Sequence, residues 1–189
     1  MTKKKVMKFI KKYYVAVIII LCSILLDQLT KLIASNNLEY KIGEDEKVIF
    51  TNSVEIIKDF FYFTYARNTG AGWSILSGEM WVLIIITIVS FAIFIYLLKD
   101  FNLKKFPFSS IGVALMLGGT LGNFIDRISQ GFVVDFLDFI IFGYDFPIFN
   151  VADICLVVGA MMLILQVIIS KEFFFDKKEK DSNEIEEEI

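Results

Sequence analysis

The sequence contains no histidine, only two prolines and only two cysteines among its 189 residues. Without histidine, Ser-His and Cys-His catalytic pairs are excluded and an ordinary zinc site is disfavoured. Cys22 and Cys155 both lie in hydrophobic runs, which predicts buried, apolar-like residues rather than a disulfide or a catalytic thiol. We find no phosphate-binding loop, no metal-ligand spacing and no basic patch suited to nucleic acid, so we expect no metal, no cofactor and no nucleic-acid partner.

What the chain has instead is hydrophobicity, with 56% apolar residues. Few soluble domains reach this fraction, which indicates an α-helical membrane protein. Runs of about 20 apolar residues are long enough to cross a bilayer as helices. We predict four spans in one integral-membrane unit of residues 1–170, with a long outer segment at 34–79 and a charged tail at 171–189 that is disordered from Asp176 onward. The predicted spans are 13–33, 80–98, 106–126 and 150–170.

The basic start of the first span could also belong to a cleavable signal peptide. Two features argue for a retained helix. Small residues are missing before Cys22, and the run continues into Asp27 and Lys31.

Lysines near the ends of the spans indicate the orientation, because cytoplasmic loops are rich in lysine. They fall before the first span, between the second and third, and after the fourth. An even number of spans places all three groups on one side, so both termini are expected to be cytoplasmic. The lysines are Lys3, Lys4, Lys5, Lys8, Lys11, Lys12, Lys99, Lys104, Lys105, Lys171, Lys177, Lys178 and Lys180.

Other polar residues gather at the opposite, extracytoplasmic ends of the spans. Charges beside a hydrocarbon segment are costly and need a partner or a function. Their convergence on one face therefore predicts a site there. The residues are Asp27, Lys31, Asn123, Asp126, Arg127, Asp135 and Asp153.

Three features of the sequence have two possible interpretations each. Asp27 and Lys31 are four residues apart and share a helix face, either as a self-neutralising pair or as part of the site. The β-branched and aromatic segment 54–66 predicts strands of a small sheet at the membrane interface. The glycine-rich segment 68–73 after it is either an ordinary turn or a functional loop. Residues 139–146 either cover the site or anchor the chain at the interface.

Asp135 and Asp153 are the candidate acid–base pair. When two carboxyl groups share one water molecule, one stays protonated. The ionised group can then take a proton from water while the protonated one polarises a carbonyl, which hydrolyses a peptide bond without a covalent intermediate. Asp126 has Arg127 beside it as a counter-ion, which favours a structural role, and Asp138 is expected on a solvated face.

Amides and glycines near this pair predict supporting roles. Asn123 and Asn150 can orient the carboxylates or hold a substrate backbone. Gly118, Gly119 and Gly122 allow the third helix to pack closely or to admit a chain alongside.

Five motifs in order resemble the lipoprotein signal peptidases, the signal peptidase II family of bacteria. The resemblance covers Asp27 to about Leu165. The motifs are Asp27-Gln28-Leu29-Thr30-Lys31, Asn68-Thr69-Gly70-Ala71, the stretch 118–127 (GGTLGNFIDR), the stretch 131–136 (GFVVDF) and Phe149-Asn150-Val151-Ala152-Asp153.

The resemblance implies four transmembrane helices with a small extracytoplasmic β-cradle, in a multi-pass protein of the bacterial plasma or inner membrane. It implies an aspartic endopeptidase that cleaves prolipoproteins just before a diacylglyceryl-modified cysteine, working as a monomer among membrane lipids. Its catalytic pair corresponds to Asp135 and Asp153. The supporting or substrate-binding positions correspond to Asp27, Lys31, Asn68, Gly119, Asn123, Asp126, Arg127 and Asn150.

Two alternatives lead to different expectations. A small transporter with aspartates as proton carriers predicts charges at the bilayer midplane and repeated halves, and the sequence has neither. A non-catalytic assembly factor predicts that Asp135→Asn or Asp153→Asn lowers stability and leaves any activity largely intact.

Overall fold

The computed structural model describes residues 3–38, 40–42, 48–50, 53–71 and 75–187. Four helices dominate it: α1 (Lys3–Asn37), α2 (Met80–Leu98), α3 (Pro107–Gln130) and α4 (Val151–Glu187). Each contains a segment long and apolar enough to cross a membrane, at 10–37, 80–98, 107–130 and 151–170. The predicted fold class is confirmed, and the predicted span limits differ from these segments by only a few residues.

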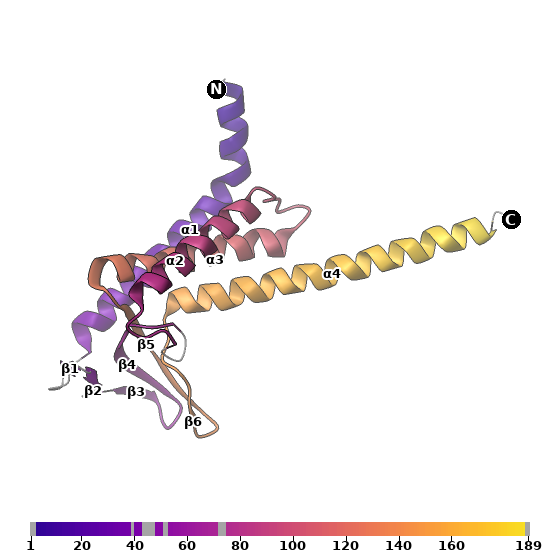
Figure 1. The fold of residues 1–189 in the computed structure, drawn as a ribbon. Coiled ribbons are helices and arrows are strands. Elements are labelled where there is room, and N and C mark those ends of the chain that lie inside the picture. Colours follow the sequence, from indigo (N-terminus) through magenta and orange to yellow (C-terminus); the bar gives the residue numbers. More distant parts are fainter. Residues whose placement is uncertain (1–2, 39, 43–47, 51–52, 72–74, 188–189) are drawn as a thin grey trace.

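Helix α3 lies at the centre of the bundle and packs against α1, α2 and α4 (Figure 1). Its glycines make this possible, since any larger residue would meet a neighbouring backbone or side chain. A Cβ at Gly118 would lie 2.5 Å from the Cβ of Ser23 in α1, and one at Gly112 would lie 2.6 Å from the carbonyl oxygen of Gly159 in α4. A Cβ at Gly119 would clash with the carbonyl oxygen of Ala152.

The outer faces of α1, α2 and α4 are apolar and exposed, as expected of surfaces that meet lipid. The prediction of burial was wrong for Cys22, which is exposed on α1, while Cys155 is half-buried; both are free thiols. In a membrane protein an apolar residue can be exposed at no cost, because lipid replaces water around it.

Helix α4 differs from its prediction at the C-terminal end. The tail was expected to be disordered from Asp176, yet the helix continues to Glu187. No glycine or proline follows Gly159, and lysine and glutamate are good helix formers. The sequence therefore offers no signal that would end the helix earlier.

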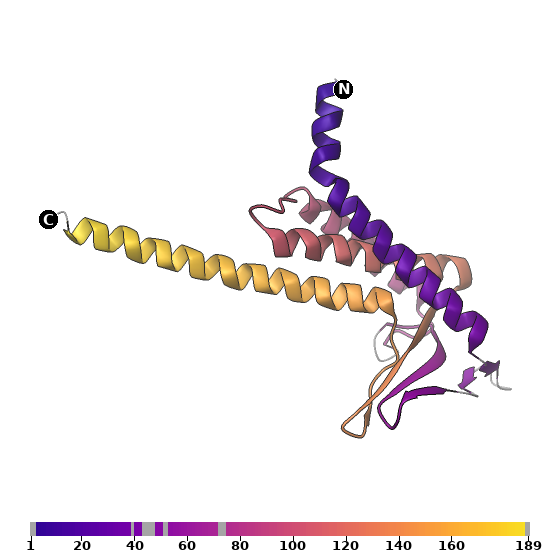
Figure 2. The ribbon, with the colours of Figure 1, turned by 180° about the vertical axis from the view of Figure 1, so that it is seen from behind.

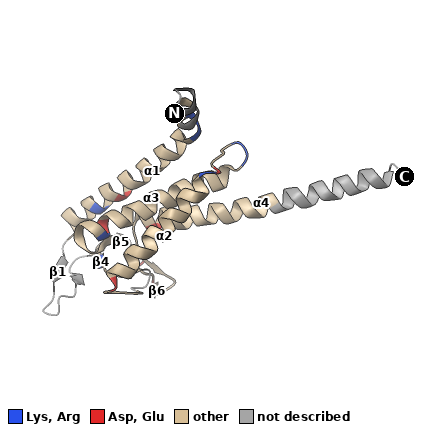
Figure 3. Cartoon of the chain, turned by 45° about the horizontal axis from the view of Figure 1, so that its top comes forward, with Lys and Arg blue, Asp and Glu red and all other residues tan. Residues whose placement is uncertain are grey.

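The two ends of the bundle are different. At one end, Lys12 donates to the carbonyl oxygen of Lys99, which brings α1 next to the loop between α2 and α3. Ala16, Phe101 and Ala114 form an apolar cluster there. The β-strands lie at the other end (Figures 1 and 2). The lysines of this loop are far from the sheet in Figure 3.

The main sheet is antiparallel in the order β3-β4-β5-β6, built from β3 (Val54–Ile57), β4 (Phe61–Asn68), β5 (Val133–Ile141) and β6 (Tyr144–Asp145). A separate pair joins β1 (Tyr40–Ile42) to β2 (Val48–Phe50). The strands predicted within 54–66 are confirmed.

Residues 139–146 form a hairpin rather than a loop, with β5 paired to β6. Its turn has positive φ at Phe142 (52°) and Gly143 (79°), and Phe142 is fully exposed. The hairpin tip points away from the helices (Figure 1).

Candidate active site

A cavity of about 850 Å³ lies at the sheet end of the bundle. Its walls come from α2, α3, α4, the ends of β4 and β5, and the segment before α4. The cavity brings together five of the predicted site residues, which come from positions far apart in the sequence. They are Asn68, Asn123, Arg127, Asp135 and Asp153.

Asp135 lies within β5 rather than in a loop, and only 2% of its surface is exposed. Both of its carboxyl oxygens accept amide hydrogens: Oδ1 from Asn150 Nδ2 at 2.6 Å and Oδ2 from Asn68 Nδ2 at 2.9 Å. Burial, followed by the negative charge of Asp153, raises the pKa of Asp135 from 3.8 to about 7. The two amides and the positive charge of Lys31 act in the opposite direction. The carboxyl of Asp135 is therefore able to hold a proton near neutral pH.

Asp153 occupies the first turn of α4, where its position follows from the sequence Asn150-Val151-Ala152-Asp153. Its backbone N–H donates to Asn150 Oδ1 at 3.0 Å, and its Oδ2 accepts the backbone N–H of Asn150 at 3.1 Å. This reciprocal pair is a capping box, which starts a helix by satisfying two free N–H groups. Its other oxygen, Oδ1, accepts from Asn123 Nδ2 at 2.8 Å.

Asn150 joins the two aspartates. Its side chain is fully buried, with Nδ2 donating to Asp135 and also to Asn123 Oδ1 at 3.1 Å. One amide thus holds the carboxyl of Asp135 while its own oxygen accepts the N–H of Asp153. Two aspartates from β5 and α4 are in this way fixed around a single asparagine.

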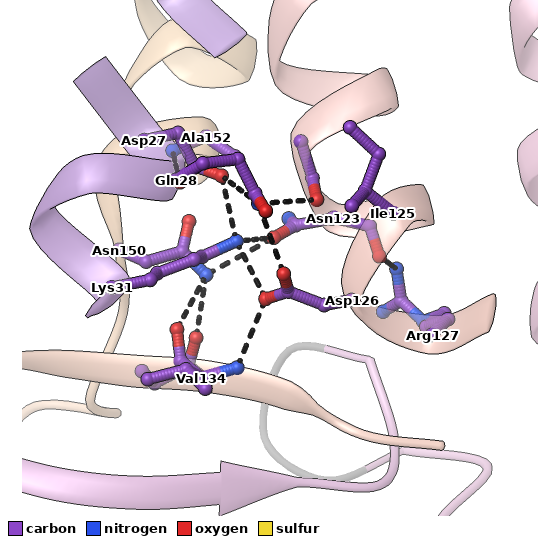
Figure 4. Close-up of polar contacts among 12 residues, drawn as sticks. Asp27, Gln28, Lys31, Asn123, Ile125, Asp126, Arg127, Val134, Asn150 and Ala152 are labelled. Carbon is purple, nitrogen blue, oxygen red and sulfur yellow. Dashed lines mark hydrogen bonds and ion pairs between the residues drawn. The ribbon is translucent and has the colours of Figure 1, made fainter. Parts of the chain in front are cut away.

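Lys31 is only 3% exposed and lies among Asp27, Asn123 and Asp126 (Figure 4). Its Nζ lies 2.8 Å from Asp27 Oδ2 and 2.9 Å from Asp126 Oδ2, and it donates to Asn123 Oδ1 at 2.9 Å. Asp27 and Lys31 are therefore not an isolated self-neutralising pair, because the network they belong to continues through Asn123 to Asp153.

The predicted counter-ion of Asp126 was wrong. Lys31 pairs with Asp126, whereas Arg127 donates to the carbonyl oxygens of Gly70 at 3.2 Å and Asn123 at 3.5 Å. Successive residues on a helix point roughly 100° apart, so Asp126 and Arg127 face different neighbours.

Arg127 thereby ties the segment after β4 to α3. At the end of β4, Asn68 Oδ1 accepts the backbone N–H of Gly70 at 2.9 Å, which leaves its Nδ2 directed at Asp135. The segment is thus more than an ordinary turn up to Ala71, which lines the cavity. Gly72 and Trp73 lie outside the described residues.

Gly119 has the first of its two predicted roles: it does not line the cavity, and it allows α3 to pack closely against α4 at Ala152. Asp138 was expected to be solvated, but it is half-buried and accepts from Thr64 Oγ1 at 2.6 Å. It does not line the cavity.

Sequence reasoning missed Gln28, Thr87 and Ser90. Gln28 Nε2 donates to Asp126 Oδ1 at 2.9 Å and lies 3.2 Å from Asp27 Oδ2. Thr87 and Ser90 line the cavity from α2. They are three apart, on one face of a helix that is otherwise almost entirely apolar, and this spacing was a signal that could have found them.

Together, the fold and the site define an integral membrane protein of the aspartic protease class. Residues 19–169 match the profile of Signal peptidase (SPase) II. The lipoprotein signal peptidase of Listeria monocytogenes serotype 4a (strain HCC23) is 44% identical over 86% of this chain and 96% of its own length. That of Staphylococcus aureus (strain JH9) is 41% identical over 90% and 98%.

Two solved structures described as bacterial membrane enzymes share 40% identity with the chain. One has a TM-score of 0.70 over 83% of this chain and 89% of its own, the other 0.67 over 81% and 92%. The chain belongs to the signal peptidase II family. The resemblance seen in its motifs is confirmed.

Proposed function

We propose that this chain removes signal peptides from prolipoproteins by hydrolysing the bond before a diacylglyceryl-modified cysteine, with Asp135 and Asp153 as the catalytic pair. The observation that carries the proposal is the sharing of Asn150 by two aspartates in one cavity. Membership of the signal peptidase II family supports the type of substrate.

The chemistry follows from placing one water molecule between the two carboxyl groups. The ionised carboxyl takes a proton from the water, whose oxygen attacks the scissile carbonyl carbon. The protonated carboxyl donates to the carbonyl oxygen as the tetrahedral intermediate forms. When the C–N bond breaks, one carboxyl donates its proton to the leaving amine and the other carboxylate takes a hydroxyl proton of the intermediate as the new carbonyl forms, so the pair again holds one proton. The raised pKa of Asp135, about 7, supports its holding that proton in many molecules near neutral pH.

The cavity walls favour a lipid-bearing substrate that arrives from the bilayer. On the α2 side they include Ile86 and Phe94, and on the α4 side Leu156 and Val157. Both helices are exposed along much of their length. We propose that the diacylglyceryl group stays among membrane lipids and these apolar side chains while the peptide reaches the aspartates.

The proposed arrangement in the cell follows from the charges. Lys12, Lys99, Lys104 and Lys105 lie at the end away from the sheet, which supports cytoplasmic termini and an extracytoplasmic catalytic pair in the bacterial cell membrane. We further propose that residues 1–170 act as one unit with 171–189 as a cytoplasmic tail. A monomer suffices, since one chain supplies both aspartates and the amides that hold them.

Cysteine labelling tests the orientation. In a Cys22→Ser, Cys155→Ala background, we expect Phe142→Cys in intact cells to react with a membrane-impermeant maleimide, and Lys104→Cys to react only after lysis. The reverse pattern would contradict the proposed topology.

Turnover of a lipidated precursor in reconstituted membranes tests the function. Asp135→Asn and Asp153→Asn should insert normally and show no cleavage, and the wild type should cleave the lipidated precursor much faster than the unlipidated one. Asp138→Asn is the matched control, an aspartate of β5 that does not line the cavity and should retain activity. Continued turnover by either variant would contradict the assignment of Asp135 and Asp153 as the catalytic pair.

A further inference from the structure

Two buried carboxylates outside the cavity make parallel contacts. Asp27 Oδ1 accepts the backbone N–H of Ala152 at 2.9 Å, and Asp126 Oδ2 accepts that of Val134 at 3.2 Å. Ala152 and Val134 are the residues immediately before Asp153 and Asp135. Lys31 lies between the two carboxylates, 2.8 Å and 2.9 Å from their oxygens (Figure 4).

We propose that Asp27, Lys31 and Asp126 form a positioning clamp that fixes the separation of Asp135 and Asp153. The two carboxylates of the clamp accept the backbone N–H of the residue before each aspartate, and Lys31 holds the two carboxylates together. The inference rests on the proposed function, because it assigns the clamp a role in that reaction. The three residues are positioning residues and not catalytic ones, since none of them lines the cavity.

The clamp connects four elements, α1, α3, α4 and β5. Asp27 and Lys31 belong to α1 and Asp126 to α3, while the N–H groups they hold belong to α4 and β5. Lys31 also donates to Asn123, whose amide holds Asp153. A displacement of Lys31 would therefore displace both Asp135 and Asp153.

Charge makes these contacts suitable for holding position. Hydrogen bonds that an ionised carboxylate accepts are shorter and stronger than those between neutral groups. The exposed fractions of Asp27, Lys31 and Asp126 are 0%, 3% and 3%. Burying three charges costs solvation that apolar residues would avoid. Their gain is geometric: one ammonium group between two carboxylates sets the distance between them.

Two neighbouring residues, Gln28 and Gly122, help to hold the clamp residues in place. Gln28 Nε2 lies 2.9 Å from Asp126 Oδ1 and 3.2 Å from Asp27 Oδ2, and so bridges the two carboxylates directly. Gly122 leaves room for Asp27, because a Cβ there would lie 2.5 Å from Asp27 Oδ2. The closeness of α1 and α3 at this level depends on that missing side chain.

The test compares an alanine and an asparagine at each carboxylate. Asp27→Ala and Asp126→Ala remove the acceptor of the backbone N–H, whereas Asp27→Asn and Asp126→Asn keep one oxygen that can accept it. We expect each alanine variant to lose about 100-fold in kcat with little change in KM, since a small misplacement near the chemistry is enough for such a loss. The asparagine variants should recover most of that loss.

Gln28→Ala serves as a milder variant should an alanine at a carboxylate prevent folding. It removes the bridge without leaving a charge unpaired, and we expect about a 10-fold loss in kcat with an unchanged KM. Asp138→Ala is the matched control, a half-buried aspartate of β5 outside the clamp, and should keep its kcat.

The outcomes separate the two proposals. If Asp153→Asn is inactive and the folded clamp variants keep wild-type kcat, the clamp is refuted and the proposed function stands. Equal losses for alanine and asparagine would also refute it, because charge and not the held N–H would then matter. If Asp153→Asn itself turns over substrate, the proposed function fails.

Discussion

The two ends of the helix bundle use charge in opposite ways. At the sheet end, Asp27, Lys31 and Asp126 are buried, and each contacts a group of another element. At the other end, Lys12 and Lys99 are exposed around a small apolar cluster. The charges at the end away from the sheet remain in water, whereas the charges of the proposed clamp are desolvated together with the proposed catalytic pair.

The largest effect that would sharpen this comparison is expected at Asn150. Asn150→Ala removes the amide that joins the two aspartates, and kcat should fall on the order of 1,000-fold, similar to the loss of a preorganised donor in other enzymes. Asn102→Ala is the control at the opposite end, where the side chain accepts the backbone N–H groups of Lys104 and Lys105. It should lower the thermal stability slightly and leave kcat unchanged. Equal losses in the two variants would break the comparison.

The second prediction compares two glycines of α3 that both pack against α4. Gly119→Ala brings a Cβ against the carbonyl oxygen of Ala152, next to Asp153, whereas Gly112→Ala meets Gly159 deeper in the same α3–α4 interface. Both should destabilise the protein by about 1–3 kcal/mol through overpacking. Only Gly119→Ala should also lower kcat, by about 10- to 100-fold, because it displaces the first turn of α4. Thermal unfolding and turnover, measured on the same preparations, check this, and a Gly119→Ala variant with wild-type kcat would contradict it.

The pH dependence of stability offers a smaller difference. The pKa of Asp135 is 3.8 when unperturbed and about 7 in the folded protein. A carboxyl with a raised folded pKa contributes stability that is complete below the lower value and is lost as pH rises through the higher one. The free energy of unfolding of the wild type should therefore fall by on the order of a few kcal/mol between about pH 4 and pH 7.

Asp135→Asn should flatten that slope, while Asp100→Asn, exposed at the opposite end, should keep it. Unfolding measured in detergent at several pH values decides this. An unchanged slope in Asp135→Asn would show that Asp135 is not the group responsible.

The smallest effect is expected for lysines at the end of the bundle away from the sheet. Lys104→Gln combined with Lys105→Gln changes two exposed charges that have no contact with the cavity. In oriented vesicles the kcat of correctly inserted protein should stay within about twofold, in line with the small cost of most surface substitutions. A loss comparable to that of Asn150→Ala would mean that the two ends are coupled.

Much of this architecture can be read from the sequence, because hydrophobic length and lysine placement determine where helices cross and end. The Asn150-to-Asp153 spacing is likewise local, since a capping box involves only four residues. The partners of Asp126 could not be read this way, because the neighbour in sequence, Arg127, points elsewhere on the helix. Gln28 and the continuation of α4 were also missed, since the first depends on tertiary contacts and the second on the absence of a stop signal.

The most direct test of the catalytic pair is single-turnover cleavage of a lipidated precursor by Asp153→Asn, with enzyme in excess over substrate in a bilayer. This substitution keeps the size of the side chain and removes its ability to accept a proton from water. We predict no product above the level of an enzyme-free control over many wild-type half-times. Product formation at a rate within about tenfold of the wild type, a difference too small for the loss of an essential base, would contradict the account.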